Sequence, residues 1–390
     1  MLLIKNADVY TPESIGRRDV LLDSTLLALS DSIHLTPESG LATDWFDAEG
    51  LMLIPGLVDA LVHYTGGGGE AGFASRTPPL KAEQAWQAGV TSMVGCLGTD
   101  AITRSHVDLL ATARGLSEQG VNAWCLTGSY AVPTPTLTGS VERDLVLIPE
   151  IIGVGELALG DHRGSQPGWQ EVATIAAASR RGAMLAGKLG TLLLHLGDAD
   201  QPLAIVEQVL ANTELPRSLF YPTHCNRTQD TFDACLKFAL AGGAIDFTTS
   251  TTPALIEAGE VPAARALALA LDANVDPSKL TMSSDGQASL PCFNVAQELV
   301  DTQVACISSL WQSVQVAVME HSVPFEHALA SVTANPARVM GLNKSGRIQP
   351  GASADLLLLD PESLTLMATI SGGVIRWQNK EAQLRHREAA

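Results

Sequence analysis

Eight short apolar runs in the middle of the chain constrain the fold more than any other feature of the sequence. Most of them are followed by stretches with helical character, and strands that alternate with helices are typical of a parallel sheet with both faces covered. Eight such strands are the number that closes a (β/α)8 barrel. The apolar runs lie at 57–63, 90–97, 121–128, 151–159, 191–196, 219–224, 244–250 and 280–285. The main helical stretches lie at 81–88, 170–181, 203–212, 231–241 and 263–271.

A doubly wound α/β sheet is the main alternative fold. It contains fewer strands and usually carries G-x-G-x-x-G after its first strand. In this chain the first apolar run ends in His63 instead. We therefore predict an α/β fold of the (β/α)8 TIM-barrel type over residues 55–344.

The two ends of the chain follow a different pattern. Residues 1–54 alternate short apolar runs with turn-prone segments, and β-type runs return at 351–360 and 373–377. The chain has 390 residues, which exceeds the about 250 that a barrel needs. We expect residues 1–54 and 345–390 to form one small β-sandwich domain beside the barrel. A further helical stretch is expected at about 296–321.

Composition excludes several classes of partner. The formal net charge is -18, whereas binding to nucleic acid or anionic membranes needs clustered Lys and Arg. The sequence contains no run of about 18 apolar residues, so no membrane span is predicted. The first residues alternate like a strand and lack the features of a signal peptide, so we expect a cytoplasmic protein. The six cysteines are widely spread without C-x-x-C, and most are expected to be buried small hydrophobes.

Ligand-type residues stand where the predicted barrel strands end. His63, His195, His224 and Asp285 close four of the apolar runs, and Glu156 interrupts a fifth. Catalytic groups of barrel enzymes lie at the carboxyl ends of the strands, and imidazole and carboxylate are suitable ligands for Zn²⁺. A single histidine at a strand end is usually a structural residue. Five such residues converging on one mouth indicate a metal site.

Four consecutive glycines at 66–69 precede Glu70, directly after the first predicted strand. A glycine-rich loop can bind phosphate, but neither G-K-[ST] nor a helix start follows here. The loop is better interpreted as an active-site segment that carries Glu70.

Taken together, these residues resemble the bacterial isoaspartyl dipeptidases of the amidohydrolase superfamily over nearly the whole chain. The glycine loop with Glu70 and the Thr-Gly-Ser-Tyr segment that ends at Tyr130 are specific to that branch, whereas 350–355 is general to the superfamily. The other matching segments are 55–59, 76–78, 98–100, 138–142, 161–163, 195–198, 222–227 and 283–286.

The resemblance implies a zinc hydrolase that cleaves β-aspartyl dipeptides, and it implies a role for each matching residue. Asp285 matches the general base and acid, and Tyr130 matches the group that polarises the scissile carbonyl. Substrate binding is implied for the remaining positions: Glu70 for the α-amino group, Arg163, Arg227 and Ser289 for carboxylates, and Thr99 in the matching Gly-Thr-Asp segment.

Two positions depart from the family pattern. The family's first strand carries His-x-His, but here Leu61 replaces the first histidine. Glu156 stands where the family usually has a lysine whose carbamate bridges two metals. We therefore expect one Zn²⁺ per chain, held by Glu156, His195 and His224, with a second metal weak or absent. His63 is then a free polar group or a weak ligand of a second ion, and Asp285 is also expected among the metal-binding residues.

Two other functions remain open from the sequence. A related amidohydrolase could act on an N-acyl amino acid or a cyclic imide, although Glu70 disfavours substrates with an uncharged α-nitrogen. A non-catalytic descendant could bind acidic dipeptides without cleaving them. In each case the partner is a small molecule, and the resemblance suggests a homo-oligomer.

Overall fold

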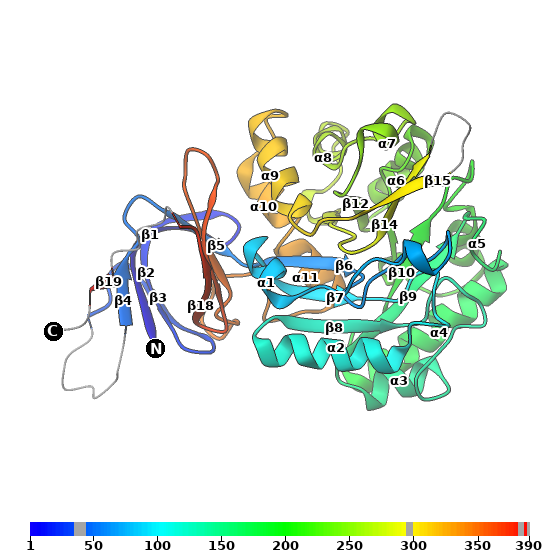
Figure 1. Cartoon of the computed structure of the whole chain (residues 1–390), viewed down its shortest axis with the longest axis horizontal. Coiled ribbons are helices and arrows are strands. Elements are labelled where there is room, and N and C mark those ends of the chain that lie inside the picture. Colours follow the sequence, from blue (N-terminus) through cyan, green and yellow to red (C-terminus); the bar gives the residue numbers. More distant parts are fainter. Residues whose placement is uncertain (35–43, 294–298, 381–385, 388–390) are drawn as a thin grey trace.

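The computed structural model describes residues 1–34, 44–293, 299–380 and 386–387, and it has two parts (Figure 1). A β-rich part contains both chain ends, and a larger α/β part contains the middle of the chain. Among the described residues, none of the helices has both the length and the apolar character needed to cross a membrane.

The β-rich part is built on one nine-stranded sheet with strands from both ends of the chain. Seven strands run in the order β18-β17-β16-β5-β1-β2-β3, and β4 pairs with β1 and β19. One face of this sheet covers an apolar cluster that includes Ile4, Val20, Leu53 and Leu356, all inaccessible to solvent. The strands are β1 (Leu2–Tyr10), β2 (Ser14–Leu22), β3 (Leu26–Ser30), β4 (Asp44–Asp47), β5 (Met52–Pro55), β16 (Leu356–Leu359), β17 (Leu366–Ser371), β18 (Val374–Gln378) and β19 (His386–Arg387).

The α/β part contains a curled sheet of six parallel strands in the order β11-β10-β9-β8-β7-β6, and a parallel pair β12–β13. Each of the eight predicted apolar runs contains one of these strands. The amide of Cys225, after β11, donates to Asp246 O in β12 at 3.1 Å. The amide of His63, after β6, donates to Gly286 O, beyond β13, at 2.8 Å. The strands are β6 (Leu57–Val62), β7 (Val90–Gly95), β8 (Asn122–Thr127), β9 (Ile151–Leu159), β10 (Thr191–Leu196), β11 (Phe220–Thr223), β12 (Ile245–Thr248) and β13 (Leu280–Ser283).

Helices separate the strands and begin where the sequence offers capping side chains. The hydroxyls of Ser105, Thr228 and Thr252 accept backbone amides in the first turns of α2, α6 and α7. The helices after the strands are α1 (Ala82–Gln87), α2 (His106–Gln119), α3 (Val141–Leu147), α4 (Trp169–Ala186), α5 (Ala204–Asn212), α6 (Gln229–Leu240), α7 (Pro253–Glu257) and α8 (Ala263–Asp272). The 3-10 turns in the described part of the chain are η2 (Phe73–Ser75), η3 (Arg217–Leu219) and η4 (Pro277–Lys279).

The parallel strands are buried on both faces, and two apolar clusters share them. Side chains such as Leu61, Val94, Cys96 and Leu126 form one cluster with residues of α11 (Ala334–Met340). The other side chains of the same strands pack against the helices in a second and larger cluster. This two-sided burial explains why the strands read as continuous apolar runs in the sequence.

The predicted helix at 296–321 is wrong over part of its length. Residues Leu299–Val304 form β15, which pairs antiparallel with β14 (Ser289–Phe293). The helix begins later, as α9 (Ser309–Met319), and α10 (Phe325–Ala330) follows it. β-branched residues such as Thr302 and Val304 favour a strand once a partner strand is available, and that partner cannot be read from the local pattern. The first residues of the predicted stretch, 296–298, lie outside the described part of the chain.

Candidate active site

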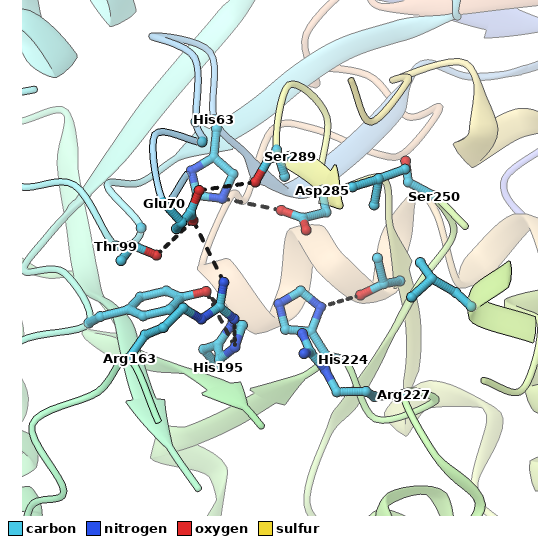
Figure 2. Close-up of a pocket in the computed structure, with 18 of the residues that line it drawn as sticks. His63, Glu70, Thr99, Arg163, His195, His224, Arg227, Ser250, Asp285 and Ser289 are labelled. Carbon is cyan, nitrogen blue, oxygen red and sulfur yellow. Dashed lines mark hydrogen bonds and ion pairs between the residues drawn. The ribbon is translucent and has the colours of Figure 1, made fainter. Parts of the chain in front are cut away.

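The predicted site residues come together around one pocket (Figure 2). His63 follows β6, His195 lies in β10, His224 follows β11 and Asp285 follows β13. These four line the pocket with all the residues that the family resemblance implied in catalysis or substrate binding: Glu70, Thr99, Tyr130, Arg163, Arg227 and Ser289. Glu156, in β9, lies fully buried among the histidines.

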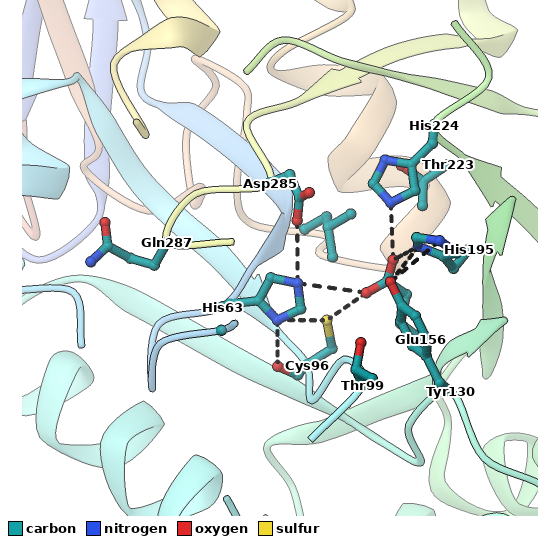
Figure 3. A network of polar contacts seen from close by, with 12 residues as sticks. His63, Cys96, Thr99, Tyr130, Glu156, His195, Thr223, His224, Asp285 and Gln287 are labelled. Carbon is teal, nitrogen blue, oxygen red and sulfur yellow. Dashed lines mark hydrogen bonds and ion pairs between the residues drawn. The ribbon is translucent and has the colours of Figure 1, made fainter. Parts of the chain in front are cut away.

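One oxygen of Glu156 is shared by two histidines (Figure 3). Its Oε1 lies 2.8 Å from His195 Nδ1 and 3.1 Å from His224 Nε2. The ligand atoms of these three buried residues are all within 4.8 Å of one another. Burial raises the pKa of Glu156, but the two histidines outweigh burial and hold the pKa well below its ordinary value. Burial and the nearby His195 lower the pKa of His224 to about 4. The cluster is therefore an ionised carboxylate with nitrogen donors, a suitable donor set for a divalent metal.

The second oxygen of Glu156 faces a different pair of side chains. Its Oε2 lies 3.6 Å from His63 Nε2 and 3.8 Å from Cys96 Sγ. His63 Nε2 also lies 3.2 Å from Asp285 Oδ1. Burial raises the pKa of the Cys96 thiol to about 11. Cys96 is a member of the site that the sequence argument missed, because its place at the end of an apolar run made it look like an ordinary core residue.

The remaining ring nitrogens of the three histidines have partners of their own. Asp161 Oδ2 lies 2.9 Å from His195 Nε2, and Thr248 Oγ1 lies 2.6 Å from His224 Nδ1. The carbonyl oxygen of Cys96 lies 3.3 Å from His63 Nδ1. Such contacts fix the orientation of metal-binding histidines. The sequence argument gave Asp161 and Thr248 no role. Asp161 could have been suspected because it stands beside Arg163 in a segment that matches the family.

Two residues of the site have backbone conformations that non-glycine residues seldom adopt. His224 has φ 59° and Asp285 has φ 53°. Such strain persists only when surrounding contacts impose it. Near Asp285 the contacts come from Asp59, whose carboxylate accepts the Ser284 amide at 3.0 Å and the Ser284 hydroxyl at 2.5 Å. By holding Ser284, Asp59 directs the carboxylate of the next residue, Asp285, into the pocket.

Tyr130 lies at the edge of the metal-ligand cluster. Its hydroxyl is 2.7 Å from His195 Nδ1, and the Arg163 guanidinium lies 5.4 Å from the centre of its ring. Burial and the charge of Glu156 raise the pKa of Tyr130 well above its ordinary value. The phenol is therefore a neutral donor throughout the physiological pH range.

Glu70 lies in the pocket with Thr99, Ser289 and Arg163 around it (Figure 2). It accepts hydrogen bonds from Thr99 Oγ1 at 3.0 Å and Ser289 Oγ at 3.3 Å, and Arg163 Nη1 lies 3.6 Å away. Arg163 also donates to Asp161 from Nε at 2.9 Å and from Nη2 at 2.6 Å. This salt bridge fixes Arg163 between the metal-ligand side and the Glu70 side of the pocket.

The glycine loop that carries Glu70 is tightly folded. Gly66 and Gly68 have positive φ values, and a Cβ on either would lie 2.4 Å from a backbone oxygen, so no other residue fits. Arg104 donates to three carbonyl oxygens around the loop, including Gly67 O at 2.7 Å. These contacts hold Glu70 in place. The loop therefore positions this carboxylate, as the sequence indicated, rather than forming a phosphate-binding loop.

Arg227 lines the pocket on the His224 side and carries a second positive charge. Its Nη1 lies 3.8 Å from Asp198 Oδ1. Glu260 also lines this pocket, and burial raises its pKa to about 7. The charged groups that line the pocket thus include the Glu70 carboxylate and the guanidinium groups of Arg163 and Arg227. This arrangement suits a small ligand with both an ammonium group and carboxylates.

A curled sheet of parallel strands whose carboxyl ends surround a buried histidine–carboxylate cluster is the architecture of the metal-dependent amidohydrolases. The sequence profile of the amidohydrolase family matches residues 245–378. The solved structure of a dihydropyrimidinase from Brevibacillus agri NCHU1002 shares this fold, with a TM-score of 0.64, 15% identity, and coverage of 99% of this chain and 96% of that chain.

Two solved structures are much more similar in sequence. A beta-aspartyl dipeptidase from Fervidobacterium islandicum AW-1, in complex with the beta-Asp-Leu dipeptide, is 39% identical with a TM-score of 0.88. A second structure of the beta-aspartyl dipeptidase from that organism is 38% identical with a TM-score of 0.86. Each comparison covers 97% of this chain and 100% of the other chain. The chain therefore belongs to the amidohydrolase family and, within it, to the family of the beta-aspartyl dipeptidases.

Proposed function

We propose that the protein hydrolyses β-aspartyl (isoaspartyl) dipeptides through a metal-activated water, with Asp285 as general base and acid. The observation that carries this proposal is the placement of Glu70. Its carboxylate is held by Thr99 and Ser289 in the pocket that also contains the histidine–carboxylate cluster. A free α-amino group is the ligand that such a carboxylate recognises. The Fervidobacterium relative, whose structure holds beta-Asp-Leu, supports the same substrate class.

Glu156, His195 and His224 would hold the catalytic metal, which we propose to be Zn²⁺. All three are buried and offer one oxygen and two nitrogen atoms within 4.8 Å of one another, a normal donor set for zinc. When bound, the ion would lower the pKa of a water molecule towards neutrality and polarise the substrate carbonyl. Asp161 and Thr248 would orient the two imidazoles through their other nitrogen atoms.

The chain's own residues carry the proton movements. Asp285 accepts a proton from the attacking water; its side chain lines the pocket, with Oδ1 3.2 Å from His63 Nε2. Tyr130 donates its hydroxyl proton as a hydrogen bond to the carbonyl oxygen, on which negative charge develops. Asp285 then transfers the proton to the amide nitrogen as the C–N bond breaks. The products are the free side-chain carboxylate of aspartate and the amine of the second residue.

The charged groups of the pocket would hold the substrate in this orientation. Glu70 accepts the α-ammonium group, with Thr99 and Ser289 at its oxygen atoms. Arg163 and Arg227 bind the carboxylates at either side of the scissile bond. An N-acylated substrate would bring no positive charge to Glu70, which disfavours the N-acyl amino acids considered above.

The experiment that tests this proposal is hydrolysis of β-aspartyl-leucine by the zinc-supplemented protein, with α-aspartyl-leucine and N-acetyl-β-aspartyl-leucine as controls. We expect release of leucine from the β isomer alone. Cleavage of a cyclic imide or an N-acyl amino acid instead would assign the protein to another amidohydrolase reaction. Tight binding of β-aspartyl-leucine without cleavage would support the non-catalytic alternative.

We also propose that the eight parallel strands form a closed barrel. The backbone hydrogen bonds Cys225 N–Asp246 O and His63 N–Gly286 O support closure, because they link the β12–β13 pair to both edges of the six-stranded sheet.

We further propose that the barrel spans 55–344, and that 1–54 and 345–390 form one β-sandwich domain. The β-rich part has an apolar cluster of its own, which supports this division. The cytoplasmic location and the homo-oligomer stay predictions, and sedimentation velocity tests the assembly.

A further inference from the structure

We propose that Cys96 is a metal ligand, and that Cys96, His63 and Glu156 form a second cation site beside the one held by Glu156, His195 and His224. Glu156 would then bridge two zinc ions, one on each carboxylate oxygen. This inference rests on the proposed function for the first site, and it replaces the expectation from sequence that the second metal is weak or absent.

The first observation is the spacing of the side chains. Cys96 Sγ lies 3.8 Å from Glu156 Oε2, and His63 Nε2 lies 3.6 Å from the same oxygen. The ligand atoms of the three residues are all within 4.8 Å of one another. Two ligands at about 2.0–2.3 Å from a tetrahedral zinc ion lie roughly 3.3–3.5 Å apart. The separation of 3.6 Å is too long for a nitrogen–oxygen hydrogen bond but suits two atoms that share one cation.

The second observation is the condition of the carboxylate oxygens. Glu156 is fully buried, and its Oε1 already has His195 and His224 at 2.8 and 3.1 Å. Its Oε2 has only the longer contacts with Cys96 and His63. A buried charged oxygen needs strong donors or a cation to offset its desolvation. A cation between Oε2, the imidazole and the sulfur would supply this compensation.

Asp285 contacts His63 but lies outside the group of three ligands. Its Oδ1 lies 3.2 Å from His63 Nε2. His63 presents Nε2 to the carboxylates of Glu156 and Asp285, while its Nδ1 lies 3.3 Å from the Cys96 carbonyl oxygen and 4.0 Å from Cys96 Sγ. A ligating histidine is usually oriented in this way, by a carbonyl on its other nitrogen. One nitrogen, one sulfur and one carboxylate oxygen, from His63, Cys96 and Glu156, lie around the position of the proposed ion (Figure 3).

The strand register explains how a cysteine reaches this place. Val62 pairs with Gly95 across β6 and β7, and the Cys96 amide donates to Val62 O at 3.3 Å. Cys96 and His63 are therefore neighbours at the ends of adjacent strands. Leu61, which replaces the family's first histidine, lies in the apolar cluster between the strands and α11. The sulfur of Cys96 would take over the role of the missing imidazole.

A thiolate ligand also selects the metal. Soft sulfur donors favour Zn²⁺ over Mg²⁺, Ca²⁺ and Mn²⁺, which prefer oxygen. An ordinary core cysteine makes a different prediction, because it binds no metal and tolerates replacement by alanine or serine. The two interpretations are therefore separated by metal content and by spectroscopy of the sulfur.

The test uses the full-length protein loaded with Zn²⁺ or with Co²⁺ and freed of excess metal by gel filtration. We expect two ions per chain in the unchanged protein and one in Cys96→Ala and Cys96→Ser. The Co²⁺ form should show a near-ultraviolet sulfur-to-cobalt charge-transfer band, and both substitutions should remove it. Cys125→Ala is the matched control, because Cys125 is also buried but packs in the cluster on the helix side. It should keep both ions and the band.

Other outcomes have distinct meanings. One ion per chain and no charge-transfer band in the unchanged protein would overturn the inference, as would two ions retained in Cys96→Ala. His63→Gln should also bind one ion, which keeps the test valid if the cysteine variants misfold. These readouts do not depend on turnover. Failure to cleave β-aspartyl-leucine with two bound ions would refute the proposed function alone, whereas cleavage with one ion would refute the inference alone.

Discussion

Replacing Tyr130 by phenylalanine isolates the contribution of one hydroxyl group to the proposed reaction. The hydroxyl is 2.7 Å from His195 Nδ1, which also has Glu156 Oε1 at 2.8 Å, so its removal leaves no imidazole nitrogen without a partner. The ring keeps its packing against Arg163. We therefore expect a loss of stability of only about 1 kcal/mol.

The expected effect on catalysis is much larger. A donor to the developing oxyanion contributes about 3–4 kcal/mol, so kcat should fall roughly 10²–10³-fold. KM should change little, because the hydrogen bond strengthens only as charge develops on the carbonyl oxygen.

The assay is release of leucine from β-aspartyl-leucine, measured together with bound metal. Tyr10→Phe is the control for a tyrosine outside the pocket, where the ring packs on Phe325. A kcat for Tyr130→Phe within threefold of the unchanged enzyme, at equal metal content, would refute the role of Tyr130 as oxyanion donor. A large loss of bound metal would show that the hydroxyl acts instead through His195.

Three further predictions test other parts of the site. Asp285→Asn should abolish turnover while at least the ion at Glu156, His195 and His224 stays bound, which metal analysis checks; equal activity would refute the assignment. Glu70→Gln should raise KM for β-aspartyl-leucine at least tenfold, and an unchanged KM would place the α-amino group elsewhere. Burial raises the pKa of Glu260 from 4.5 to about 7, so the folded state holds this proton more tightly than the unfolded state. At about 1.4 kcal/mol per pH unit, this group should remove roughly 3 kcal/mol of stability as the pH rises from 4.5 to 7, and Glu260→Gln should remove that dependence in urea unfolding.

The positions of most site residues could be predicted from the sequence because parallel strands end at one edge of their sheet. His63, His195, His224 and Asp285 each stand at the end of an apolar run, and the structure brings all four to one pocket. Glu156 was visible because a buried strand rarely contains a carboxylate. The substrate-side residues have no such periodic signal: the four-glycine loop pointed to Glu70, and only the family resemblance identified Arg163 and Arg227.

The sequence could not give contacts that depend on which strands are neighbours. Cys96 ends an apolar run just as an ordinary core residue does, and its meaning appears only when β7 is placed beside β6. Asp161 and Thr248 approach the histidines from loops and a different strand. The pairing of β14 with β15 was not predicted for the same reason, because it depends on which strands become neighbours rather than on the local sequence pattern.

The two departures from the family pattern are consistent with one compensating change. A glutamate is shorter than a lysine carbamate, yet His63 after β6 and Cys96 after β7 both approach its Oε2, at 3.6 and 3.8 Å. In the sheet order β9-β8-β7-β6, one strand separates β9 from Cys96's side of the sheet, whereas two separate β9 from β6, which carries Leu61. In the proposed second site, the thiol at the end of β7 would stand beside His63 in place of the histidine lost from β6. Position 61 is then free to fill the apolar interior, where Leu61 is completely buried.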